Sequence, residues 1–129
     1  MFFSGMIDKQ QAELIQLRFG LTLKLILDQN KSKAIDNPKK NIIDSYGKLE
    51  TSSGLRKATL IDFASGKSNP SGTTIAAILE ALDMSFSEFG AIYDKITEKE
   101  VLEYKKEIEK SRKDRDTKRP ANKKSKPRK

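Results

Sequence analysis

The sequence contains no cysteine and no histidine. Disulfides and thiolate chemistry are therefore excluded, and so are zinc sites of the usual ligand types and histidine-based triads. There is no run of 18 apolar residues, and the Met1-Phe2-Phe3 start lacks the basic and apolar regions of a signal peptide. We expect a cytoplasmic protein with no membrane association, no enzymatic activity, no cofactor and no bound metal.

Apolar residues are also scarce, at 36% of the 129 residues, and beyond Lys105 only Ile108 and Ala121 remain. The charge is uneven: residues 1–96 carry 12 basic and 11 acidic side chains, whereas residues 97–129 carry 14 and 7. A segment with so little to bury cannot pack as a core. The sequence predicts a basic tail that attracts polyanions, nucleic acid first, or that serves only solubility.

Helical periodicity and capping signals predict an all-α fold. The expected helices cover about residues 8–29, 44–53, 56–65, 71–82 and 85–96, and a last one begins near Thr97 and frays beyond about Lys113. Capping boxes are predicted at Asp8 with Gln11, at Ser85 with Glu88 and at Thr97 with Glu100. The polar segment 30–41, which contains Asn37-Pro38, is predicted to be a loop. On the fifth helix, one side is predicted to carry Phe86, Phe89, Ile92, Tyr93 and Ile96.

Residues 44–66 hold two short helical segments, each followed by a glycine. Two helices that cross closely need a turn residue with positive φ and an apolar residue behind it, which Gly54 and Leu55 supply. We expect a side chain at position 54 to strain and overpack the turn. The predicted core of this region and of the next helix is Leu49, Leu60, Phe63, Ile75, Ile78, Leu79 and Leu82.

The segment resembles the helix-turn-helix of phage repressor and Cro proteins, the xenobiotic-response-element family. The matching positions are Leu49, Gly54, Leu55, Leu60, Phe63, Gly66, Asn69 and Pro70. The resemblance covers about residues 43–96 and implies a compact five-helix DNA-binding domain over 1–96. A C-terminal helix (97–110) and a basic disordered tail (111–129) would follow. Glu50 departs from the small residue usual in the family and is expected to extend into solvent or to pair with a cation such as Arg56.

An outward-facing second helix fits the DNA major groove. Lys57 is placed to contact guanine or phosphate and Ala58 and Ile61 to contact thymine methyl groups, whereas Asp62 fits cytosine but repels phosphates. All of these side chains could also be ordinary exposed residues. The full set of predicted DNA-binding residues is Ser45, Tyr46, Arg56, Lys57, Ala58, Thr59, Ile61, Asp62, Ser65, Lys67 and Ser68.

Two functions remain open. The first is a sequence-specific regulator of transcription that binds double-stranded DNA as a homodimer, pairing through apolar residues of the last two helices. The second is an antitoxin of a toxin-antitoxin pair, or another protein-interaction module with a repressor-like domain. The scarcity of apolar anchors beyond Ile108 favours a polyanion over a protein partner for the tail.

Overall fold

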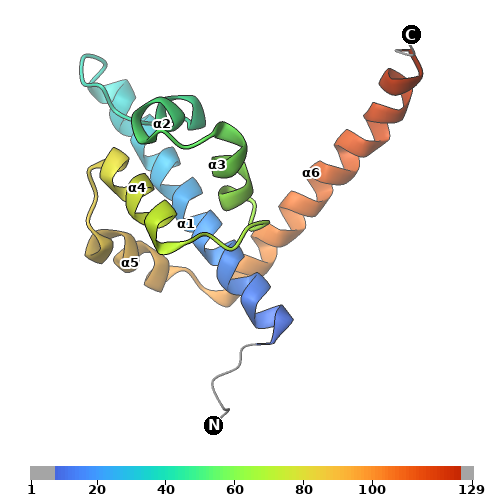
Figure 1. Cartoon of the computed structure of the whole chain (residues 1–129), viewed down its shortest axis with the longest axis horizontal. Helices are drawn as coiled ribbons and strands as arrows, with labels where there is room; N and C mark the ends of the chain where they lie inside the picture. Colours follow the sequence, from blue (N-terminus) through green and yellow to red (C-terminus); the bar gives the residue numbers. More distant parts are fainter. Residues whose placement is uncertain (1–7, 126–129) are drawn as a thin grey trace.

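The computed structural model describes residues 8–125 of the backbone and the side chains of residues 8–113, and this part contains six helices and no strand (Figure 1). The predicted all-α fold class is therefore confirmed. The helices are α1 (Lys9–Asp36), α2 (Tyr46–Ser53), α3 (Lys57–Ala64), α4 (Gly72–Leu82), α5 (Phe86–Lys95) and α6 (Glu98–Ser125).

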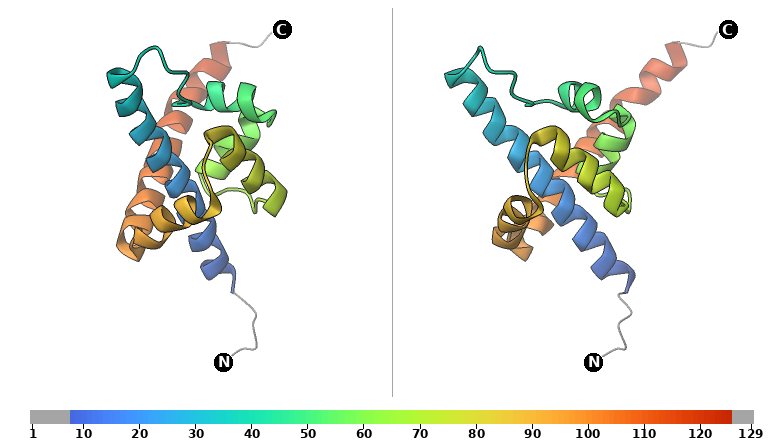
Figure 2. Two further views of the ribbon diagram at one scale, coloured as in Figure 1. Left: turned by 90° about the vertical axis from the view of Figure 1, so that its left-hand side faces the viewer. Right: turned by 60° about the vertical axis from the view of Figure 1, so that its left-hand side comes forward.

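Helix α1 is the element around which the others are arranged (Figures 1 and 2). It packs directly against α3, α5 and α6, whereas α2 packs against α3 and α4. The two short helices of the predicted helix-turn-helix are therefore held from behind by α1 and α4.

Three groups of buried side chains make the core. The largest joins Leu23 and Leu27 of α1 to the predicted core positions Leu49, Leu60, Phe63 and Ile78. A second joins Leu79 to Ile26 and Phe89, and Ile75 and Leu82 pack partly buried against both groups. Burying such side chains is the main force that holds short helices together.

The third group joins the N-terminal half of α1 to the start of α6. Leu17 and Leu21 of α1 pack against Ile96, Val101 and Tyr104, all of which are buried. The core therefore continues across the predicted boundary at residue 96 and includes the first turns of α6.

The predicted capping boxes form. At the start of α1 and of α5, the side chains of Asp8 and Ser85 accept from the backbone of Gln11 and Glu88, whose side chains accept in return. Thr97 and Glu100 exchange the same two bonds at the start of α6. The backbone and hydroxyl of Ser85, followed by the nearby charge of Lys33, keep the pKa of Glu88 below its ordinary value.

Helix α1 is longer than predicted: it ends at Asp36 instead of about residue 29, so the connection to α2 is shorter. Lys and Ala are good helix formers, and the side chain of Asn30 donates to the carbonyl of Ile43 at 2.8 Å instead of breaking the helix. The helix stops only at Asn37, whose backbone is disfavoured for helix by the proline that follows.

Two further differences concern the C-terminal half. Phe86 was expected on the apolar side of its helix, but at the first position of α5 it is 61% exposed. Helix α6 continues to Ser125, past the predicted fraying point near Lys113. Of the predicted disordered tail, residues 126–129 lie outside the described residues. No helix in the described part of the chain is long and apolar enough to cross a membrane.

Candidate nucleic-acid interface

The turn between α2 and α3 has the geometry that the sequence predicts. The hydroxyl of Ser45 caps α2. Gly54 ends this helix with φ of 79° and donates its backbone N–H to the backbone carbonyl of Glu50 at 2.9 Å. Leu55 follows, partly buried against the core. The expected overpacking at position 54 is wrong, since a Cβ built there has no other atom within 4 Å. Strain at this position comes from the backbone alone.

Helix α3 is fixed most firmly at its C-terminal end. Leu60, Phe63 and Ala64 are buried, and a Cβ on Gly20 of α1 would clash with the carbonyl of Ala64. The same carbonyl accepts a hydrogen bond from the hydroxyl of Tyr104 in α6. Three helices therefore meet at this point, and the orientation of α3 depends on α6 as well as on α1.

The opposite face of α3 is open. The predicted base-contacting residues Lys57, Ala58 and Asp62 are exposed, and Ile61 is 44% exposed although it is apolar. Arg56 precedes them and is exposed too, whereas Thr59 is partly buried. Five of the eleven predicted residues are thus exposed side by side along the chain, on α3 and at its N-cap.

Glu50 has a partner that was not expected. Its Oε2 accepts a hydrogen bond from the backbone N–H of Lys57 at 3.2 Å. The side chain is exposed, which agrees with the predicted extension into solvent, and among the described residues it forms no ion pair with Arg56. Arg56 occupies the N-cap position of α3 and makes no side-chain capping bond. The carboxylate from α2 therefore supplies the acceptor that the first turn of α3 lacks and places a negative charge where helix dipoles attract anions.

The predicted phosphate-binding residues at the start of α2 are less available. Ser45 uses its hydroxyl to accept from Lys48, and Tyr46 packs against the core. Burial, and then the negative charge of Asp28, raises the pKa of Tyr46. Tyr46 lines a hollow of about 420 Å³ with Asp28, Asp44 and Glu107, and Lys24 and Lys48 pair with the first two of these carboxylates at 3.3 and 2.9 Å.

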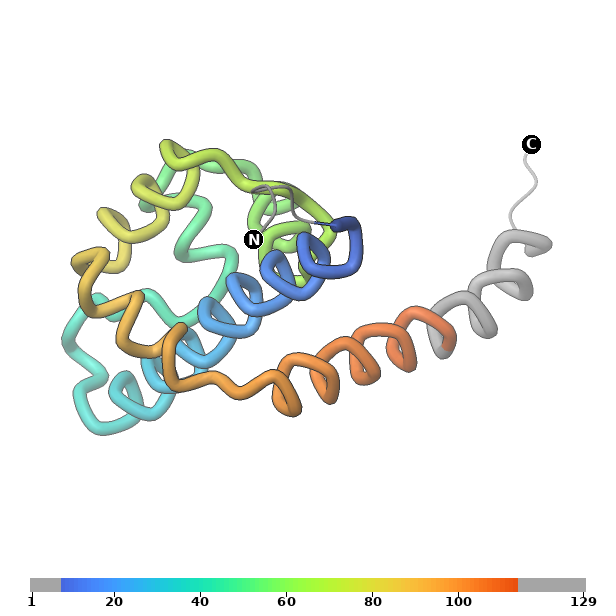
Figure 3. Tube along the Cα trace, turned by 90° about the horizontal axis from the view of Figure 1, so that it is seen from below, coloured from blue at the N-terminus to red at the C-terminus, as the bar shows by residue number. Residues whose placement is uncertain are grey.

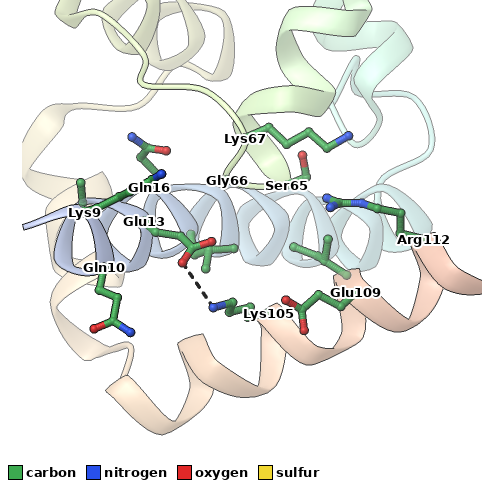
Figure 4. A pocket seen from close by; sticks show the side chains of 13 residues that line it. Lys9, Gln10, Glu13, Gln16, Ser65, Gly66, Lys67, Lys105, Glu109 and Arg112 are labelled. Atoms are coloured by element: carbon green, nitrogen blue, oxygen red, sulfur yellow. Dashed lines mark hydrogen bonds and ion pairs between the residues drawn. The ribbon is translucent and has the colours of Figure 1, made fainter.

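The residues after α3 lie in a different environment. Ser65 and Lys67 line a groove of about 510 Å³ between α1, the turn after α3, and α6 (Figure 4), and Ser68 is partly buried beyond it. Lys105 closes one side of the groove by an ion pair with Glu13 at 3.2 Å. At the other end, Lys67 and Arg112 extend from opposite sides toward the region beside Ser65.

Arg112 belongs to the predicted basic tail and not to the predicted helix-turn-helix site. The helical spacing of Val101, Tyr104, Ile108 and Arg112 would have located it, since residues three or four apart share a helix face.

We compared the chain with known protein families, with curated proteins and with solved structures, and nothing in any of the three matches it. Among residues 8–113, no group of three or more acidic side chains could hold a metal ion. The resemblance to the repressor-like family therefore stays a prediction from residues 43–96.

Proposed function

We propose that the protein binds double-stranded DNA in a sequence-specific manner and regulates transcription, with α3 in the major groove. The observation that carries this proposal is the exposed face of α3, which follows a tight glycine turn and is held from behind by buried Leu60 and Phe63. A short, protruding helix with a firmly packed rear face suits insertion into a groove that admits one α-helix.

The chemistry of this face agrees with base recognition. Lys57 is an exposed donor for guanine, and the exposed apolar surface of Ile61 and Ala58 suits thymine methyl groups. Asp62 accepts from cytosine and disfavours other bases. Arg56 directly precedes α3, and Lys67 and Ser68 follow it; in this proposal they contact phosphates.

We also propose that the protein binds as a homodimer, because two recognition helices then meet half-sites about 34 Å apart. Ile96, Val101 and Tyr104 are buried within one chain and are unavailable for pairing. Among the side chains that the structure describes, the large apolar residues of α5 and α6 that remain exposed are Phe86 at 61% and Leu102 at 42%. These two residues are the proposed dimer contacts.

Selection of bound duplexes from a random library tests the function directly. We expect a two-fold symmetric site with half-sites about one DNA turn apart. The double change Lys57→Ala with Ile61→Ala should leave the circular dichroism spectrum unchanged. It should reduce discrimination between the selected site and random DNA by about tenfold or more, since base contacts contribute about 1–3 kcal/mol each.

A matched control exists on α1. Lys31 and Ile35 have the same identities and spacing as Lys57 and Ile61, and both are exposed. The change Lys31→Ala with Ile35→Ala should leave discrimination intact. If the α3 double variant discriminates as well as this control, α3 does not recognise the bases.

A further inference from the structure

The first half of α6 is attached to the rest of the domain at several separate points. The hydroxyl of Tyr104 donates to the carbonyl of Ala64 at the end of α3, and Lys105 pairs with Glu13 of α1. Just before α6, the guanidinium of Arg18 donates to the carbonyl of Ile96. Because Tyr104 bonds to α3 itself, side chains on this face of α6 have a set position relative to the proposed recognition helix.

Helix α6 then passes across α1 and leaves the body of the domain (Figure 3). Arg112 lies two helical turns beyond Tyr104 on the same face and reaches the groove beside the turn that follows α3 (Figure 4). Its neighbour across the groove is Lys67, and neither side chain forms an ion pair within residues 8–113. Two cations from different helices therefore converge without a neutralising partner.

The rest of the groove does not cancel this charge. Its acidic residues are Glu13, which Lys105 already neutralises, and Glu109, while Lys9 adds a further basic side chain. A guanidinium and an ammonium that extend toward the same region suit a single anion with several acceptor oxygens. The groove also includes Ser65 and Gly66, the two residues that directly follow α3.

We propose that Lys67 and Arg112 bind one backbone phosphate of the same DNA that α3 reads, so that α6 is a second DNA-contacting helix with a defined register. This inference rests on the proposed function. A flexible tail contacts any phosphate within reach, whereas a helix fixed to Ala64 contacts one phosphate at a constant distance from the recognised bases. The position of α6 thereby determines which flanking phosphate is bound.

Ethylation interference on the selected duplex, with the full-length protein, tests the proposal. This method shows which single phosphates must remain unmodified for binding. We expect one flanking phosphate whose ethylation weakens wild-type binding but has no further effect on Arg112→Gln or Lys67→Gln. Each single variant should lose about tenfold in affinity, because a charged hydrogen bond to phosphate is lost. The double variant should lose less than the product of the two.

Lys110→Gln is the matched control, since Lys110 is an exposed cation of α6 on the side opposite Val101. It should keep the interference pattern of the wild type. Thermal melting should be equal for all four variants, because these side chains lie outside the core. If Arg112→Gln retains the interference at every phosphate, or behaves as Lys110→Gln does, the proposal is wrong although DNA recognition stands. If no duplex is selected at all, both this proposal and the proposed function are wrong.

Discussion

The carboxylate of Glu50 in α2 accepts a hydrogen bond from the backbone N–H of Lys57 in α3, across the turn at Gly54. The N-cap residue of α3, Arg56, offers no acceptor of its own. Glu50, seven positions before Lys57, therefore takes the part of a helix cap, and it also joins the two helices of the turn.

We expect Glu50→Ala to lower the free energy of unfolding by about 1 kcal/mol, as for loss of a side-chain cap. Removing this carboxylate should also raise the affinity for random DNA, because an anion beside the proposed DNA-facing helix repels phosphates. Urea unfolding and binding at low salt measure the two effects.

The variant Glu50→Gln separates the effect on stability from the effect on affinity for random DNA. Glutamine keeps an acceptor for the Lys57 amide but has no charge, so its stability should stay close to wild type while its affinity for random DNA rises as in Glu50→Ala. Equal stability loss in both variants would show that charge, and not the hydrogen bond, stabilises the turn.

At Gly54, φ of 79° lies in the left-handed region, and the space around it is open. We expect Gly54→Val to cost about 1–3 kcal/mol through backbone strain alone. Gly54→Asn should cost less, because asparagine tolerates this conformation best among side-chain-bearing residues. Thermal melting of the two variants gives the comparison.

Gly90 provides the control, since it lies within α5 and its added Cβ also meets nothing within 4 Å. Gly90→Ala should stabilise by about 0.5–1 kcal/mol, as alanine does in a helix interior. An unchanged midpoint in Gly54→Val would contradict the left-handed turn.

The hydroxyl of Tyr104 should make the free energy of unfolding depend on pH in the alkaline range. Burial raises the pKa of Tyr104, and the nearby Tyr46, Glu107 and Asp28 raise it further. Above about pH 10 the unfolded chain releases this proton while the folded chain retains it, so the free energy of unfolding falls as pH rises. We expect Tyr104→Phe to be less stable than wild type at pH 8, by about 1 kcal/mol, and to lose less stability between pH 9 and 11.

Tyr93→Phe is the comparison, because Tyr93 is partly buried against Phe19 and beneath Arg18. Parallel stability curves for Tyr104→Phe and wild type would mean that the hydroxyl does not hold its proton in the folded chain.

Ending the chain after Lys113 deletes eight basic and two acidic residues and leaves Arg112 in place. If about four of the eight contact phosphates, the slope of log affinity against log salt should become shallower by roughly 3.6. Affinity for specific and random DNA should fall together, and the melting temperature should stay the same. Identical slopes would assign the tail to a protein partner or to solubility.

Local signals accounted for much of the fold. Each capping box needs only two residues three apart, and Gly54 needs only its own lack of a side chain, so both can be read from a few neighbouring positions. The hydrogen bond from Tyr104 to Ala64 and the groove that Lys67 and Arg112 line could not be predicted in this way. They depend on how α6 lies across α1, and a thin stripe such as Val101, Tyr104 and Ile108 does not specify which helix it meets.

The contact between Leu17 and Leu21 at one end of the chain and Val101 and Tyr104 at the other also bears on how the protein is made. A ribosome adds about 5–20 residues each second, so on the order of ten seconds pass between synthesis of Leu21 and synthesis of its partners. During that interval Leu17 and Leu21 lack the part of their covering that Val101 and Tyr104 supply. Packing of this third group therefore begins only after residues 101–104 have been synthesised.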